Sequence, residues 1–156
     1  MGQGETFRGD PLPAIILASY GTVTTSSPVG VLTLLGDNTG RFEFGDCPQG
    51  LRRLFEAGIT WHVPGHSPLS GDYIGHDQVG GFFQRTMELS GGAFGIDVHN
   101  VLAEDDLVVA LVTVKAERNG LSASFPEIHV WRMKNGKATD FREYQGDEQR
   151  EDRSWS

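Results

Sequence analysis

The sequence predicts an α+β domain whose C-terminal half is a curved antiparallel sheet. Strand-like runs follow one another at 93–103, 107–117, 121–133 and 137–145. Their connections are short, and two contain Asn-Gly, at 119–120 and 135–136, which is a strong local signal for a hairpin. A helical pattern at 78–89 comes before them, opened by Asp77 and closed by Gly91 and Gly92. This order predicts helices packed on one face of a four-stranded meander.

The N-terminal part of the chain is expected to be less regular. Residues 1–28, rich in Gly, Pro, Thr and Ser, are predicted to be irregular, and residues 29–156 to form a single domain. Asp46 and the proline that follows it predict a short helix that passes through Phe55 and ends at Gly58. A short strand at 59–63 and a Pro- and Gly-rich loop at 64–75 are expected next.

Length and charge argue against several classes of function. The 156 residues suit one domain with one core. The 21 acidic and 13 basic residues give a net charge of −8, which argues against nucleic acid or an anionic membrane as the main partner. The apolar stretch 12–18 is too short for a membrane span and lacks a basic n-region. The lone cysteine, Cys47, suits a reducing compartment, so a cytoplasmic location is expected.

The strand predicted at 107–116 is apolar on both faces. Leu107, Val109 and Leu111 share one face, and Val108, Ala110, Val112 and Val114 share the other. An antiparallel strand commonly has one face in water, so a doubly apolar strand needs cover on both sides. Because helices can cover only one of these faces, the pattern predicts a homodimer.

Several short motifs between Arg41 and Trp155 carry a resemblance to a known family. They are Gly45-Asp46, the run 61–65 (Trp-His-Val-Pro-Gly), the glycines at 71 and 75, the run 98–103 (Val-His-Asn-Val-Leu-Ala), Gly136-Lys137, the run 141–144 (Phe-Arg-Glu-Tyr) and the segment 147–155. In order and spacing the chain resembles the SnoaL-like branch of the nuclear transport factor 2-like superfamily. The resemblance implies a cone-shaped fold, commonly dimeric, in which helices and a bent sheet enclose one pocket.

The same superfamily includes ketosteroid isomerases, whose catalytic positions can be compared with this chain. Those enzymes use a Tyr as oxyanion donor, an Asp as proton shuttle and a protonated Asp as second donor. The matching positions hold Asn38, Val63 and His129. Because the proton shuttle is replaced by Val63, the resemblance implies that steroid isomerisation by that mechanism is not the activity.

The superfamily also includes limonene epoxide hydrolases, which use an Arg and two carboxylates together with a Tyr and an Asn that orient water. The matching positions hold Ala110, Val112 and Glu143, with Trp61 and Val63 in place of the water-orienting pair. One carboxylate of the constellation remains. The resemblance is therefore nearest to the polyketide cyclase-like branch.

His129 and Glu143 are the predicted acid/base residues. His129 alternates with Glu127, Trp131 and Met133 on one strand face, and an imidazole between large apolar side chains can act as acid or base near neutral pH. Glu143 follows Phe141 at strand spacing, and a carboxyl group on a pocket wall would have a raised pKa. The alternatives are a hydrogen-bonded core histidine, and an ion pair of Glu143 with a neighbouring arginine, Arg132 or Arg142.

Whether these two side chains share a face depends on the hairpin between their strands. A two-residue turn at 135–136 would place Arg142 opposite His129 and turn Glu143 away. A three-residue loop at 134–136 with Gly136 in the left-handed conformation would place Phe141 opposite His129 and make Glu143 its diagonal neighbour. The three-residue loop is preferred, because it matches the parity that the resemblance implies.

The remaining polar and aromatic candidates line the predicted pocket or its loops. The predicted substrate-binding residues are Trp61, Val63, Phe82, His99, Ala110, Val112, Trp131 and Phe141; for His99 a solvated face is the alternative. The histidines at 62, 66 and 76 match no zinc spacing, so no metal is predicted. The glycines have no phosphate-loop order, and no cofactor is predicted.

These observations support one leading hypothesis and two rivals. The leading hypothesis is a cofactor-independent enzyme that moves a proton on a hydrophobic, polyketide-like small molecule, in a cyclisation, isomerisation or aldol-type step, with His129 and Glu143 as acid and base. The rivals are a non-catalytic module of the same fold that binds a small apolar molecule or a partner protein, and a structural dimer with no ligand. No nucleic-acid or membrane partner is expected.

Overall fold

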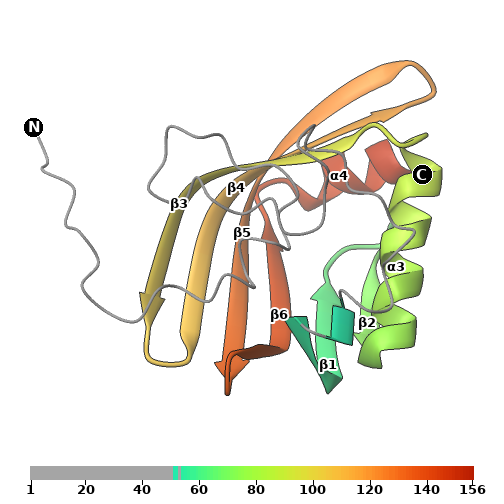
Figure 1. Cartoon of the computed structure of the whole chain (residues 1–156). Coiled ribbons are helices and arrows are strands. Elements are labelled where there is room, and N and C mark those ends of the chain that lie inside the picture. The colour runs from blue at the N-terminus through green and yellow to red at the C-terminus, as the bar shows by residue number, and fades with distance from the viewer. Residues whose placement is uncertain (1–50, 53) are drawn as a thin grey trace, which may run out of the picture.

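The computed structural model describes residues 51, 52 and 54–156. The elements are β1 (Phe55–Val63), β2 (Gly71–Ile74), α3 (Gly75–Leu89), β3 (Phe94–Glu104), β4 (Leu107–Arg118), β5 (Leu121–Lys134), β6 (Lys137–Gln145) and α4 (Glu148–Trp155) (Figure 1). The predictions for residues 1–28 and for the start of the helix at 46–50 lie outside the described residues.

The strands form one curved, six-stranded sheet in the order β2-β1-β6-β5-β4-β3 (Figure 1). β1 runs parallel to β6, and every other neighbouring pair is antiparallel. The α+β class and the cone-like layout predicted from the sequence are confirmed. The sheet is larger than the predicted four-stranded meander, because β1 and β2 extend it beyond β6.

The predicted helix through Phe55 to Gly58 is wrong. Leu51, Arg52 and Leu54 are helical, but Phe55 already begins β1. Phe55, Ile59, Trp61 and Val63 are all buried, and the strand lies between β2 and β6. Phe55 pairs with Ala138 of β6, and β2 pairs with the later part of the strand, from Thr60 to Val63. This pairing and the burial of Phe55 outweigh the weak local helical signal, as tertiary context commonly does.

Two short elements escaped the prediction. β2 lies inside the segment expected to be a loop and pairs with β1 from Gly71 opposite Val63 to Ile74 opposite Thr60. α4 occupies the charged C-terminal segment, and the Asp147 side chain caps it by accepting a hydrogen bond from the Arg150 amide at 3.0 Å. α3 begins at Gly75 rather than Gln78 and ends at Leu89 as predicted.

The hairpin between β5 and β6 differs from both predicted forms. Lys134 pairs with Lys137 across a two-residue turn in which Asn135 and Gly136 have φ values of 49° and 77°, the conformation that Asn-Gly favours. Beyond Met133 and Ala138 the register shifts, so that Arg132 pairs with Asp140 and Thr139 is the extra residue of a bulge. The preferred three-residue loop was wrong.

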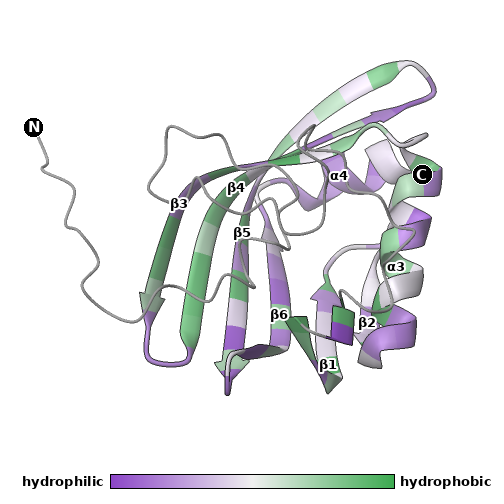
Figure 2. Cartoon of the chain, in the orientation of Figure 1, coloured by the Kyte–Doolittle hydropathy of each residue, from purple (hydrophilic) through white to green (hydrophobic). Residues whose placement is uncertain are grey.

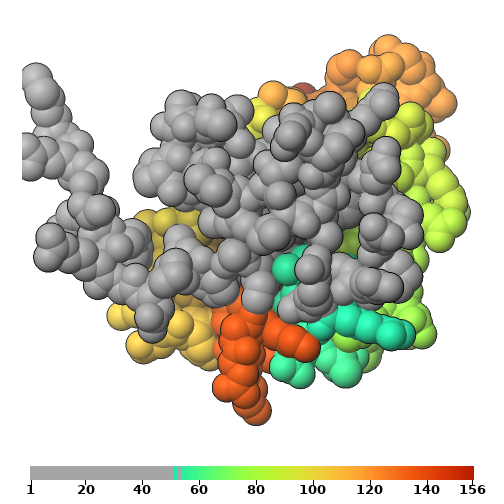
Figure 3. Space-filling view, viewed as in Figure 1, coloured from blue at the N-terminus to red at the C-terminus, as the bar shows by residue number. Residues whose placement is uncertain are grey.

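The sheet has two unlike faces. The inner face carries Val108, Ala110, Val112 and Val114 of β4, all buried, and is covered at β1 by α3. The outer face exposes apolar residues from four adjacent strands, which are Leu102, Leu111, Ile128 and Tyr144. Figure 2 shows apolar colour along β3 and β4 and polar colour at their connecting turn. In Figure 3 the end of the β4–β5 hairpin projects from the body, and there Leu121 is 75% exposed.

Aromatic rings on the inner face pack into one cluster that supports the middle of the sheet. The Trp61 ring stacks on Phe141 with centroids 3.8 Å apart, and it meets Trp131 edge-on at 5.4 Å. Phe82 and Phe83 of α3 contact the same indole at 5.6 and 5.0 Å. Such ring pairs add to the free energy gained by burying apolar area. Among the described residues, no helix is long and apolar enough to cross a bilayer.

Replacing Phe141 with Ala should strongly destabilise the protein. Phe141 is 1% exposed, and removing a buried phenyl ring costs about 3–5 kcal/mol of the free energy of unfolding. Arg142→Ala is the matched control, because this exposed neighbour makes a 3.4 Å ion pair with Asp140 and should lose less than about 1 kcal/mol. Urea unfolding measures both, and equal losses would show that the ring cluster does not support the sheet.

Candidate functional site

The candidate site is a group of ionisable side chains on the inner face, at the pairing of β5 with β6. Alternation along β5 points Glu127, His129 and Trp131 to this face, where all three are buried. His129 pairs directly with Glu143 across the two strands. The bulge at Thr139 makes this possible, since a two-residue turn without it would have placed Arg142 opposite His129.

Hydrogen bonds hold these side chains in place. His129 Nε2 and Glu127 Oε2 are 2.8 Å apart and share a hydrogen bond. Gln145 donates from Nε2 to Glu143 Oε1 at 2.7 Å. One nitrogen or oxygen atom from each of Glu127, His129 and Glu143 lies within 4.8 Å of the corresponding atoms of the other two.

A fourth ionisable group comes from the C-terminal helix. Glu151 of α4 is 2% exposed, and its hydrogen bond to Glu127 affects the pKa of both carboxyl groups. Among the described residues, its Oε2 atom has no hydrogen-bond partner. We call Glu127, His129, Glu143 and Glu151 together the buried acid/base cluster.

Burial keeps His129 neutral. Removal from water lowers the pKa of the imidazole to about 4, although the nearby charge of Glu143 acts in the opposite direction. The ring is therefore uncharged near neutral pH. An uncharged imidazole is the form that can accept a proton.

Burial also raises the pKa of each carboxyl group in the cluster. Desolvation is the largest cause for Glu127, followed by repulsion from Glu143. Desolvation raises the pKa of Glu143, whereas His129 and the hydrogen bond from Gln145 lower it in part. Desolvation and the hydrogen bond with Glu127 raise the pKa of Glu151 to about 10. Near neutral pH, Glu151 therefore holds a proton.

The aromatic rings on the inner face pack against the buried acid/base cluster at His129. The Phe141 ring meets the His129 ring edge-on, with centroids 5.0 Å apart, and lies 4.5 Å from Trp131. Other predicted pocket residues, namely Trp61, Val63, Ala110 and Val112, are buried on the same face of the sheet, and Phe82 of α3 packs against Trp61 there. The apolar surroundings account for the large desolvation effect on each ionisable group.

His99 is the one predicted site residue that lies apart from the others. It is the extra residue of a bulge in β3, and its exposed side chain hydrogen-bonds through Nε2 to Thr113 Oγ1 at 2.7 Å. Thr113 alternates with the buried residues of β4, so this contact belongs to the outer face. The alternative considered for His99, a solvated face, describes its position.

Glu143 does not form the ion pair that was its alternative interpretation. Arg132 binds Asp106 at 3.1 Å, and Arg142 binds Asp140 at 3.4 Å. The histidines at 62, 66 and 76 also have separate partners. His62 binds Asp72, His76 lies 2.9 Å from the Phe55 carbonyl oxygen, and His66 lies beside α4.

The sequence prediction missed Glu127 and Glu151 as site residues. Alternation placed Glu127 on the face of His129, two residues away, which was a sufficient signal. Glu151 needed the helix to be recognised first, and Asp147 followed by acidic residues in the first turn is a typical helix start.

The cluster has the donors for two kinds of chemistry. Neutral His129 and the carboxyl groups, whose pKa values are raised, can exchange protons with a bound molecule or with one another. Glu127, His129 and Glu143 are also close enough to share a metal ion. A second group with metal-ligating atoms, His66, Glu148 and Asp152, lies at the surface.

A family model for the SnoaL-like domain matches residues 41–141. The chain belongs to the SnoaL-like family. The match covers β5, which carries His129, and β6 up to Phe141, and it ends just before Glu143. No curated protein matches the chain.

Solved structures with similar folds are consistent with membership of the SnoaL-like family. It is 30% identical to Bal32a, from a soil-derived mobile gene cassette, with a TM-score of 0.66 over 72% of this chain and 90% of that one. It is 27% identical to a cystatin-like-fold protein of unknown function from Xanthomonas campestris, with a TM-score of 0.65 over 69% and 84% of the two chains. A putative SnoaL-like polyketide cyclase from Jannaschia sp. CCS1 shares the fold at 15% identity, with a TM-score of 0.59 over 93% and 92%.

Replacing Glu151 with Gln should flatten the dependence of stability on pH. The raised pKa means that the folded protein keeps a proton that the unfolded chain loses above its ordinary pKa of 4.5. This group's contribution to stability is therefore complete below that pH and is lost as the pH rises toward 10. Gln keeps the neutral form at all pH values. Relative to that of the parent, the free energy of unfolding of the variant should increase by up to about 1.4 kcal/mol per pH unit above pH 5.

Urea unfolding at intervals between pH 5 and about pH 8 measures this difference. Glu104→Gln is the control, because Glu104 is an exposed carboxylate on β3. Parallel stability curves for the parent and the Glu151 variant would contradict the prediction.

Proposed function

We propose that this protein is a cofactor-independent enzyme that moves a proton on a hydrophobic small molecule, with His129 and Glu143 as its acid and base. The observation that carries the proposal is the cross-strand pairing of His129 with Glu143 inside an apolar region, with Glu127 hydrogen-bonded to the imidazole at 2.8 Å. Groups whose pKa values are shifted by burial and by specific neighbours are typical of sites of proton transfer.

The proposed step begins with removal of a proton from a carbon beside a carbonyl group. The neutral imidazole of His129 or the carboxylate of Glu143 accepts this proton, and the electron pair moves to the carbonyl oxygen to give an enolate. Return of the proton at another carbon isomerises the molecule. Attack of the enolate carbon on a second carbonyl group forms a carbon–carbon bond and breaks the π bond of that carbonyl, whose oxygen then takes the proton back from the base; this is an aldol-type cyclisation.

Glu143 is the member of the pair best placed to meet a bound molecule. It is half-buried, whereas His129 is 4% exposed. Glu127 would orient the ring by its hydrogen bond to Nε2. Glu151, protonated beside Glu127, would limit the charge that the apolar region has to hold. These roles assign the proton transfer to His129 and Glu143, the orientation of the imidazole to Glu127 and the limitation of charge to Glu151.

The substrate class follows from the surroundings of the pair. Trp61, Trp131 and Phe141 offer aromatic faces and edges rather than charges, so an uncharged polycyclic molecule suits them better than an ionic one. Membership of the SnoaL-like family supports a polyketide-like molecule. A cytoplasmic location is also proposed, since a single cysteine suits a reducing compartment.

The rival is a binding module of the same fold without catalysis. The near-complete burial of His129 favours it, because a buried and hydrogen-bonded histidine can serve packing alone. The following experiment distinguishes a protein that only binds the molecule from one that also catalyses proton transfer.

The enzyme should exchange carbon-bound hydrogen of enolisable polycyclic ketones for deuterium in D₂O. His129→Gln and Glu143→Gln should each lower the exchange rate by roughly 10² while leaving ketone binding largely intact, because they remove the acid/base group and keep a similar shape. Nuclear magnetic resonance follows the exchange, and quenching of tryptophan fluorescence follows binding.

His99→Gln is the control for this series, because it changes an exposed histidine on the outer face. Its exchange rate should equal that of the parent protein. Binding of the ketones with no exchange above the buffer rate would favour the binding module instead.

We also propose that the protein is a homodimer formed through the outer face of the sheet. Leu102, Leu111, Ile128 and Tyr144 are 59%, 39%, 42% and 54% exposed and come from β3, β4, β5 and β6. Adjacent strands thus place four large apolar side chains on one surface, and Leu111 pairs directly with Ile128 at its centre. A contiguous apolar surface of this kind is typical of an interface between subunits.

Leu111→Lys should convert the dimer into a monomer, because it places a charge at the centre of the apolar surface that the dimer would bury. Leu121→Lys, at the exposed hairpin tip, should leave the dimer intact. Sedimentation velocity at micromolar concentration distinguishes the two species. A parent protein that sediments as a monomer would rule out the dimer.

A further inference from the structure

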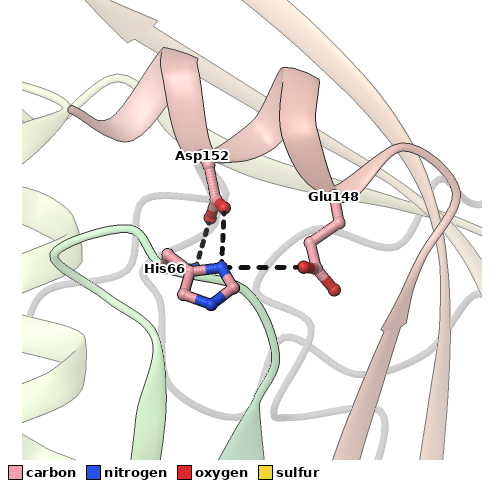
Figure 4. A group of neighbouring side chains, drawn as sticks. All are labelled: His66, Glu148 and Asp152. Carbon is pink, nitrogen blue, oxygen red and sulfur yellow. Dashed lines mark hydrogen bonds and ion pairs between the residues drawn. The ribbon is translucent and has the colours of Figure 1, made fainter.

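The loop after β1 and the C-terminal helix meet at a group of three metal-ligating side chains. His66 lies in the loop, and Glu148 and Asp152 lie one turn apart on α4 (Figure 4). Positions i and i+4 of a helix share a face, so both carboxyl groups point toward the imidazole. We call His66, Glu148 and Asp152 the surface triad. The proposed proton transfer does not use it.

The backbone of the loop is held close to α4 at this point. The His66 amide donates a hydrogen bond to Asp152 Oδ1 at 2.8 Å. Gly65 has a φ of 92°, and a Cβ atom there would lie 2.5 Å from the same oxygen. Only glycine fits such an approach. The position of His66 relative to Asp152 is therefore set by the backbone, while Oδ2 remains directed toward the ring.

The imidazole nitrogen of the surface triad lies beyond direct hydrogen bonding from both carboxyl groups, at or slightly above the spacing of two ligands around a tetrahedral ion. His66 Nδ1 lies 3.6 Å from Asp152 Oδ2 and 3.8 Å from Glu148 Oε1. Hydrogen bonds from nitrogen to oxygen rarely exceed about 3.2 Å. Two donors each 2.0–2.2 Å from a tetrahedral ion lie about 3.3–3.6 Å apart. By contrast, His62 and Asp72 elsewhere in this chain are in direct contact.

The donor types and charges fit a divalent transition metal. One imidazole nitrogen and two carboxylate oxygens are ligands that zinc accepts, with further positions taken by water. Two carboxylates balance the charge of a divalent cation. The chain's net charge of −8 also favours the approach of cations.

We propose that the surface triad binds a divalent transition metal ion such as Zn²⁺ and that this ion fastens α4 to the loop after β1. The same helix carries Glu151 on an adjacent, buried face, since Glu148 and Glu151 are three residues apart. Metal binding would therefore stabilise the docking of the element that completes the buried acid/base cluster. The role is structural, and the ion takes no part in the proton transfer.

Titration of the metal-free full-length protein with Zn²⁺ in a calorimeter tests the proposal. The parent should bind one equivalent, and its melting temperature should rise as zinc is added, because the ion binds the folded state. His66→Gln and Glu148→Gln should each weaken binding by about tenfold or more and abolish the rise in melting temperature. His99→Gln, a change in another exposed histidine, should bind zinc like the parent.

His129→Gln separates the surface triad from the buried acid/base cluster, whose Glu127, His129 and Glu143 also have ligating atoms. It should leave zinc affinity unchanged. The proposal is overturned if the parent binds no zinc, if His66→Gln binds as tightly as the parent, or if His129→Gln alone abolishes binding. None of these results would bear on hydrogen exchange by the metal-free protein, so the two proposals fail separately.

Discussion

The pairing of β5 with β6 is the constraint on which the rest of the site depends. Side chains alternate between the faces of a strand, so a shift of one residue would move Glu143 to the outer face. The Asn-Gly turn alone would produce that shift. The extra residue at Thr139 reverses it, and its hydroxyl donates to the Arg132 carbonyl oxygen at 3.3 Å within the bulge. One inserted residue thus places a carboxyl group opposite His129, and it simultaneously puts Phe141 against Trp61 and His129.

Burial of several ionisable groups in one apolar region has an electrostatic consequence for the whole cluster. Three separated carboxylate charges beside an aromatic wall would be very unfavourable, since each has lost its hydration. The structure reduces this charge by keeping Glu151 protonated, and Glu127 shares hydrogen bonds with both Glu151 and His129. The same desolvation that makes the cluster costly for folding sets the protonation state of each group, because it lowers the pKa of His129 and raises those of the carboxyl groups. The stability of the fold therefore depends on pH through the same residues to which the proton transfer is proposed.

Local patterns in the sequence were sufficient for much of this arrangement. The four C-terminal strands, the end of α3 and the inward direction of His129 all follow from alternation and turn residues. The features that could not be predicted depend on contacts distant in the chain. β1 is a strand from Phe55 because β6 pairs with it in parallel, and the bulge at Thr139 satisfies packing that no short window reveals. Alternation along β5 was sufficient to predict Glu127, whereas Glu151 lies in a charged C-terminal segment for which no helix was predicted.

That C-terminal segment shows how one short helix can serve two surfaces. α4 has only eight residues, too few for a stable helix in isolation, and so its contacts with the rest of the chain determine whether it forms. Trp155 packs near Phe94 with ring centroids 6.4 Å apart, and the Arg150 guanidinium lies 5.6 Å from the centre of the Phe125 ring. These contacts hold the helix at the end of the sheet, with Glu151 turned inward and Asp152 turned toward the loop at His66. Because a helix of this length docks or undocks as a unit, a contact made on its exposed side also affects how often Glu151 is in place beside Glu127. The outer carboxylates and the inner carboxyl group are thereby linked through the docking equilibrium of a single element.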